Sequence, residues 1–159
     1  MNHVHRIGRV LGAALMLALA SRAAADGLTL GATAGVGRAY GQTYYELGGR
    51  LGYDVGFGLT PEVGLAYWGG SSPSFVQLTP GITWYFPVPL VRPYLGGFYA
   101  HDFMKSGLPD QNGIGVRGGI GILGVGPVSV SIGVAYERIL SCSIDCDTWW
   151  PEALASFNF

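Results

Sequence analysis

The chain has 159 residues, which suits one domain, and carries a formal net charge of −1. Charged residues make up 12% of it, about half the usual ~25%, whereas 27 residues are glycine. No basic face is available for nucleic acid. So few charges, together with 13% aromatic residues and no long apolar run, argue against an ordinary soluble domain.

The first 25 residues have the pattern of a secretory signal peptide. Residues 1–9 are basic, residues 10–20 form a short apolar run, and Ala23, Ala24 and Ala25 provide a small-residue cleavage site. The apolar run is too short for a membrane helix, which needs ~20 residues. We therefore expect a mature domain at 26–159. Loss of the leader's three arginines leaves six basic and ten acidic residues, a net charge of −4.

The mature sequence is a succession of segments in which apolar residues alternate with small or charged ones. This period of two places one set of side chains on each face of a β-strand. The outward set includes Leu51, Leu65, Ile82, Leu95, Val116, Ile132 and Ala155. The predicted strands are 28–40, 45–59, 62–68, 75–86, 91–100, 113–123, 128–138 and 151–159.

The connections alternate between short turns and longer polar loops. Short turns are expected at 60–61, 87–90 and 124–127, and longer loops at 69–74, 101–112 and 139–149. The loop at 41–44 is short and breaks the rule. This layout predicts an all-β fold, an eight-stranded antiparallel up-and-down transmembrane β-barrel with both termini on the periplasmic side.

Aromatic residues are expected to form two belts at the membrane surfaces. The inner belt would contain Phe57, Trp84, Tyr85, Phe86, Phe157 and Phe159. The outer belt would contain Tyr40, Tyr44, Tyr45, Tyr67, Trp68, Tyr99, Tyr136, Trp149 and Trp150.

Three stretches resemble the small OmpA/OmpX-type outer-membrane β-barrel superfamily. They are residues 92–97 (RPYLGG), residues 115–121 (GVRGGIG) and the closing Phe157-Asn158-Phe159. The resemblance implies a bacterial outer-membrane location, contact with membrane lipid and lipopolysaccharide, and recognition of the terminal Phe by the outer-membrane assembly machinery. It implies no cofactor. It says little of the role, because such barrels serve many functions, and the external partner stays unknown.

Charged residues on the inward parity are the main candidate site. An eight-stranded barrel is just wide enough for side chains to fill, so we expect an ion-pair network that plugs the lumen, with a narrow pore as the alternative. Arg117 is expected to pair with Glu137, and Glu62 with Arg92. The predicted network comprises Glu46, Arg50, Asp54, Glu62, Arg92, Arg117, Glu137 and Glu152.

A lipid A-modifying enzyme is the third possibility. Lipid A deacylase barrels present His, Ser and an acid together on the lipid-facing surface. His101 is the one histidine of the mature chain, Ser106 falls in a loop, and Ser129 and Ser131 have inward parity. No His-x-Ser spacing exists, so we expect the protein not to be an enzyme.

Two further features concern the external rim. Cys142 and Cys146 lie in an exported loop and predict a disulfide rather than a metal site. Arg38 has outward parity near an outer strand end. It could contact lipopolysaccharide phosphate, snorkel to the interface, or be turned inward by a bulge.

Overall fold

The structure, a computed structural model, describes residues 27–86, 88, 91–105, 107–122, 127–142 and 146–159. The expected leader and parts of four expected connections, 87–90, 101–112, 124–127 and 139–149, therefore lie outside the described residues. The described part is all-β, and no helix in it is long and apolar enough to cross a membrane. Its strands are β1 (Leu28–Ala39), β2 (Gln42–Tyr53), β3 (Leu59–Gly69), β4 (Phe75–Tyr85), β5 (Val91–Met104), β6 (Gln111–Ile122), β7 (Val128–Ile139) and β8 (Asp147–Asn158).

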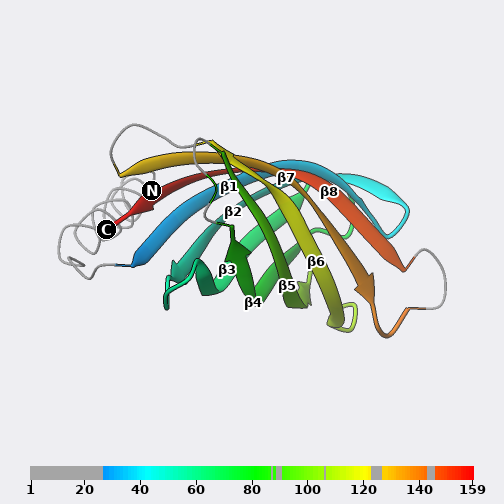
Figure 1. Ribbon diagram of the computed structural model, residues 1–159. Helices are drawn as coiled ribbons and strands as arrows, with labels where there is room; N and C mark the ends of the chain where they lie inside the picture. Colours follow the sequence, from blue (N-terminus) through cyan, green and yellow to red (C-terminus); the bar gives the residue numbers. More distant parts are fainter. Residues whose placement is uncertain (1–26, 87, 89–90, 106, 123–126, 143–145) are drawn as a thin grey trace, which may run out of the picture.

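Each strand pairs with its sequence neighbours in antiparallel fashion, and β8 pairs with β1 to close the barrel. The strands run obliquely round one wall, with β1 in blue beside β8 in red (Figure 1). The predicted eight-stranded antiparallel barrel is thus confirmed. Closure leaves no unpaired sheet edge, which is the requirement for a sheet that faces lipid.

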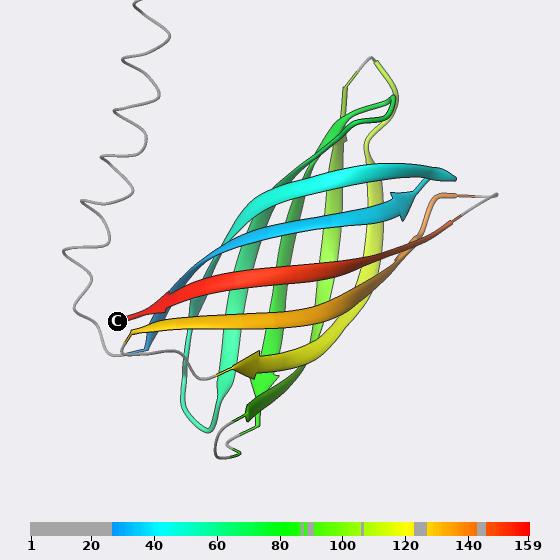
Figure 2. The same cartoon turned by 90° about the horizontal axis from the view of Figure 1, so that it is seen from above.

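The two ends of the barrel differ, and we name them by what they carry. At the terminal end, the Gly27 amide donates to the Phe159 carbonyl at 2.9 Å. The opposite end, the loop end, carries the β1–β2, β3–β4, β5–β6 and β7–β8 connections (Figure 2).

The alternation of side chains follows the predicted parity. The seven residues expected to face outward are all exposed, with Leu95 the most open of them at 59%. The charged residues between them, such as Arg50 and Arg117, are buried. Because a shift of one residue would exchange the two faces, this agreement fixes which face of β2 to β8 points outward, and the exposed Ala32, Ala34 and Val36 do the same for β1.

The β2–β3 connection differs from the prediction. β2 ends at Tyr53, and the turn occupies the next five residues, with positive φ at Gly56, Phe57 and Gly58. Thr60 and Pro61, expected to form this turn, lie within β3. The apolar alternation runs unbroken through the turn, so periodicity alone could not locate it.

Most strands also extend further toward the loop end than expected, and β5 and β8 do so by the most residues. β5 continues to Met104 and β8 begins at Asp147. The wall therefore includes residues such as His101 and Trp149 that the sequence assigned to loops.

Proline interrupts two of the ladders. The pairing of β4 with β5 skips Thr79 and Pro80, and that of β8 with β1 skips Trp150 and Pro151. Proline has no N–H to donate, so each gap follows from the residue itself.

Candidate functional site

The lumen is filled in layers, and the inward face of β5 crosses them in order. Arg92 lies nearest the terminal end, followed by Tyr94, Phe98, Ala100 and Asp102 toward the loop end. Arg92 borders a polar cavity, Tyr94 an ion-pair layer, Phe98 and Ala100 an aromatic layer, and Asp102 a pair of acids. These layers are the candidate site.

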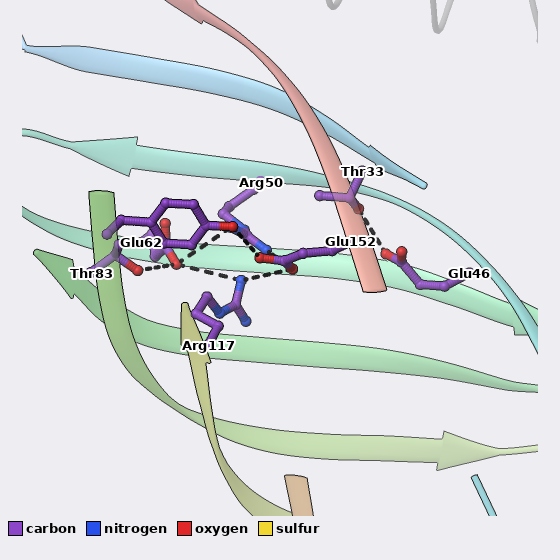
Figure 3. Close-up of polar contacts among 8 residues, drawn as sticks. Thr33, Glu46, Arg50, Glu62, Thr83, Arg117 and Glu152 are labelled. Atoms are coloured by element: carbon purple, nitrogen blue, oxygen red, sulfur yellow. Dashed lines mark hydrogen bonds and ion pairs between the residues drawn. The ribbon is translucent and has the colours of Figure 1, made fainter. Parts of the chain in front are cut away.

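The ion-pair layer joins two arginines to two glutamates across the lumen (Figure 3). The Arg50 Nη2 atom donates to Glu152 Oε2 at 2.9 Å and its Nη1 lies 3.9 Å from Glu62 Oε1. Arg117 Nη1 lies 3.6 Å from Glu62 Oε1 and 3.9 Å from Glu152 Oε2. The four side chains are only 2–8% exposed. The layer is electrically balanced, as burial of this many charges requires.

Neutral groups complete the layer from other strands. Tyr94 donates to Glu152 Oε1 at 3.1 Å, and Thr83 donates to Glu62 Oε1 at 2.8 Å. The Arg117 guanidinium lies 4.4 Å above the centre of the Phe98 ring and makes a cation–π contact with it. The members therefore come from β2, β3, β4, β5, β6 and β8, and the layer ties most of the wall together.

Two predicted pairs are wrong. Arg117 contacts Glu62 and Glu152 instead of Glu137, and Glu62 contacts the two central arginines instead of Arg92. In the register Arg117 lies opposite Ala135, which makes Glu137 its diagonal neighbour, but the guanidinium points toward Glu62 and Glu152 instead. Parity predicted which residues share the lumen, but the choice of partner depends on how far each long side chain reaches across it.

The other predicted members lie outside this layer. Glu46 is buried and accepts from the Thr33 hydroxyl at 2.7 Å. Arg92 lies over the Tyr85 ring at 5.3 Å. Asp54, predicted to be lumenal, is in the β2–β3 turn, where its carboxylate accepts from the Gly56 amide at 2.8 Å. The turn begins at Asp54, so the alternation of the strand no longer decides which way this side chain points.

Glu137 belongs to a second cluster nearer the loop end. The Gln77 side-chain amide donates to Glu137 Oε2 at 2.8 Å and to Asp102 Oδ1 at 3.0 Å. Tyr40 donates to the other Asp102 oxygen at 2.7 Å, and burial together with this carboxylate raises the pKa of the Tyr40 hydroxyl. Among the described residues no cation lies within ion-pair distance of either acid.

An aromatic layer fills the lumen on the loop-end side of the ion-pair layer. Trp68 stacks on Phe75 with ring centres 5.5 Å apart and meets Trp150 edge-on at 5.0 Å. Tyr44 and Phe98 pack at its borders, and all five rings are 0–6% exposed. The prediction that the outer belt contains Tyr44, Trp68 and Trp150 is wrong, because these side chains point into the lumen. Each has the same parity as the buried charges of its strand, and this was the signal that could have located them.

Lumenal glycines make room for large side chains. A Cβ atom on Gly115 would meet the Phe98 ring, and one on Gly133 would meet the Tyr94 hydroxyl. Gly113 likewise lies under the Glu137 carboxylate. Glycine is needed here for close approach rather than for turning, so the glycine-rich inward face does not leave a hollow lumen.

A polar cavity of about 180 Å³ lies in the lumen at the terminal end. Arg92, Ser131, Ser156 and Thr60 line it, and Tyr85 lies between it and the ion-pair layer. The space that continues past Tyr85 to Arg50 measures about 10 Å³. That is at the lower limit of what one water molecule needs, ~10–15 Å³.

The outer wall carries the remaining predicted residues. The His101 Nδ1 lies 2.7 Å from Asn112 Oδ1, and its Nε2 lies 3.7 Å from Asp110. Arg38 is exposed and faces outward, so no bulge turns it in. Cys142 and Cys146 form the predicted disulfide. The described residues contain no group of three or more His, Cys, Asp or Glu that could hold a metal.

Solved structures of three outer-membrane proteins share this fold. The N-terminal β-barrel domain of Pseudomonas aeruginosa OprF matches with a TM-score of 0.66 and 15% identity, covering 82% of this chain and 97% of that one. Neisserial surface protein A matches at 0.60 and 17%, covering 83% and 96%. The outer-membrane enzyme PagL matches at 0.53 and 13%, covering 82% and 99%.

No protein-family model matches the sequence, and no curated protein matches it. At these identities the similarity shows a shared fold only. It does not show that the chain belongs to the OmpA/OmpX-type superfamily.

Proposed function

We propose that the protein is an outer-membrane β-barrel with a closed lumen, which serves a structural or surface-interaction role and is not an enzyme. The observation that carries the proposal is the pair of stacked layers, balanced ion pairs and then packed aromatic rings, across one barrel. The fold it shares with a surface protein and an outer-membrane enzyme supports the location.

The proposed orientation puts the terminal end in the periplasm and the loop end outside. The even number of strands supports it, because barrels of this kind place their short turns, and with them both ends of the barrel, in the periplasm. Outside, the partners would be lipopolysaccharide and an unknown external factor, and Arg38 would face lipid phosphate. No cofactor is proposed.

A narrow pore is the second candidate, and the polar cavity at the terminal end favours it. Against it, the space beyond Tyr85 is about 10 Å³ and the aromatic layer lies further along the same path. A continuous pore through the barrel would require both the ion-pair layer and the aromatic layer to open.

Conductance across planar bilayers separates the two candidates. The wild type should give no current steps. The charge-neutral double variant Arg117→Ala with Glu62→Ala, and the variant Trp68→Ala with Trp150→Ala, should each stay closed because the other layer remains. The combined variant should conduct. Retained heat-modifiable mobility on gels checks that each variant is folded, and discrete current steps from the wild type would establish the pore instead.

The enzyme alternative rests on His101, which faces outward with Asp110 beside it. Its polar contacts are the amide of Asn112 and the carboxylate of Asp110, and the residue two positions on is Phe103 rather than a nucleophile. We expect His101→Ala to leave the acylation of lipid A unchanged in the mass spectrum of the producing strain. A changed acylation pattern would promote the enzyme candidate.

A further inference from the structure

The outer wall is hollowed where the barrel closes. Ala34 on β1 lies opposite Ala153 on β8, and Ala153 lies opposite Ile132 on β7. The single-carbon side chains of the two alanines lie between larger ones, with Val36 58% and Ile132 51% exposed. The result is a shallow, mainly apolar groove, open over most of its extent, with about 890 Å³ of space over β1, β8, β7 and β6.

The seam itself is irregular at this place. The β1–β8 pairing runs as far as Gly35 opposite Glu152, skips Val36 and Gly37, and resumes with Arg38 opposite Trp149. Pro151 stands at the gap and lines the groove. The groove therefore follows from two features of the sequence, small outward residues and a proline in β8.

A charged residue with no partner stands at the loop end of the groove. Arg38 follows Ala34 and Val36 on the same outward face of β1, is exposed, and has no ion pair or hydrogen bond with the residues described. The other outward arginine, Arg138, lies 3.8 Å from Asp147. The neighbour of Arg38 across the ladder is Trp149, which is 54% exposed.

The dimensions suit a lipid whose head lies at Arg38. The four residues from Arg38 to Ala34 span ~13 Å along the strand, which at the usual tilt of ~35–45° is ~9–11 Å of depth, and the half-thickness of a bilayer's hydrocarbon core is ~15 Å. An acyl chain that starts beside Arg38 and runs down the groove would thus reach toward the bilayer centre. Arginine presents a planar fork that matches phosphate oxygens, and tryptophan prefers this depth of the membrane.

We infer that this groove and Arg38 form one binding site for lipopolysaccharide, with an acyl chain in the groove and a lipid A phosphate on the guanidinium. The inference rests on the proposed function, because only the orientation with the loop end outside puts Arg38 in the leaflet that contains lipopolysaccharide. Charge complementarity selects a phosphorylated lipid over a second copy of this chain, whose own Arg38 would repel it.

The test is native mass spectrometry of the detergent-solubilised full chain with added bisphosphorylated lipopolysaccharide. The wild type should retain the lipid. Arg38→Gln should weaken retention roughly tenfold, the scale of one hydrogen-bonded charge contact. Ala153→Leu, which fills the groove on an exposed face, should weaken it as well. Arg138→Gln is the matched control and should retain the lipid, since Arg138 already has Asp147.

Several outcomes would overturn the inference. If Arg38→Gln retained lipopolysaccharide as well as the wild type does, or if the wild type retained phosphatase-treated lipopolysaccharide equally well, the contact with phosphate would be ruled out. If the wild type retained phosphatidylglycerol equally well, the preference for lipopolysaccharide would be ruled out. A wild-type dimer that Ala153→Leu dissociates would make the groove a self-association surface. Each of these results leaves the closed lumen and its bilayer test untouched, whereas current steps from the wild type would overturn the proposed function alone.

Discussion

Arg117 contacts both acids of the ion-pair layer, so its removal leaves an excess of negative charge in a buried place. We expect Arg117→Ala to lower the free energy of unfolding by ~3–5 kcal/mol. Arg117→Ala combined with Glu62→Ala keeps the layer neutral and should cost less than the single change. Urea unfolding in detergent, followed by tryptophan fluorescence, measures both.

Arg38→Ala in lipopolysaccharide-free detergent is the control for this comparison. It removes an exposed arginine without a partner among the described residues, so the unfolding free energy should stay within ~0.5 kcal/mol of wild type. A double variant less stable than Arg117→Ala would show that the layer acts through packing rather than charge balance.

Glu137 and Asp102 share one amide donor, and two ionised carboxylates so placed would repel each other. Glu137→Gln should therefore be tolerated or stabilise the barrel. Gln77→Leu removes the shared donor and should destabilise it by ~1–3 kcal/mol. Thermal loss of gel mobility in the two variants tests the contrast, and a Glu137→Gln barrel weaker than Gln77→Leu would contradict it.

At the level of single residues, parity predicted that Glu46, Arg50, Arg117 and Glu152 point inward, and they do. Parity could not predict the ion-pair partners, because an arginine side chain reaches across several strands. Which acid it contacts depends on the shape of the whole lumen. Trp68 shows a different error, since its parity was correct and the preference of tryptophan for membrane surfaces was given more weight.

Within β6, the close approach of Phe98 makes Gly115 sensitive to any added side chain. A Cβ there would meet the ring and also lie 2.6 Å from the Tyr136 carbonyl oxygen, which cannot move freely. Gly115→Ala should cost ~1–3 kcal/mol of stability. Gly97→Ala on β5 is the matched control, since its Cβ would approach nothing nearer than 3.9 Å. Urea unfolding of the pair distinguishes them, and equal stabilities would refute the packing argument.

The β7–β8 hairpin is closed at its end by a backbone bond as well as by the disulfide. The Ile139 amide donates to the Cys146 carbonyl at 2.8 Å. The disulfide spans only four residues outside the ladder, so it constrains the unfolded chain little. Reduction should leave the temperature at which the barrel loses its folded gel mobility nearly unchanged, and a large drop would mean that the hairpin end holds the barrel.

Strand existence and order could be predicted from periodicity, whereas strand ends could not. The β2–β3 turn at 54–58 lies inside an unbroken apolar alternation, and its backbone depends on positive φ at Phe57 between two glycines. Thr60-Pro61 looked more like a turn because proline usually ends a strand. Pro61 is accommodated in β3 opposite Ile82 at an exposed position.

Across the whole molecule, the outward face forms an apolar band that should stand in lipid. Leu51 lies on this band and is 44% exposed. Leu51→Arg should destabilise the barrel in phospholipid vesicles by ~2–4 kcal/mol, the cost of arginine near the bilayer midplane. Thr43→Arg, at the loop end of the same strand, should cost ~0–1 kcal/mol because it can reach water. Equal costs in vesicle unfolding would place the band elsewhere.

The order of layers read along β5 has a consequence for leakage. Apart from the contact of Arg117 with Phe98, the ion pairs and the aromatic rings are held by different contacts, so opening one layer need not open the other. If each were open one time in ~100, a range typical of minor states, both would be open together only one time in ~10,000. Two layers in series therefore block leakage far better than either layer alone. No single substitution in either layer should make this barrel leak.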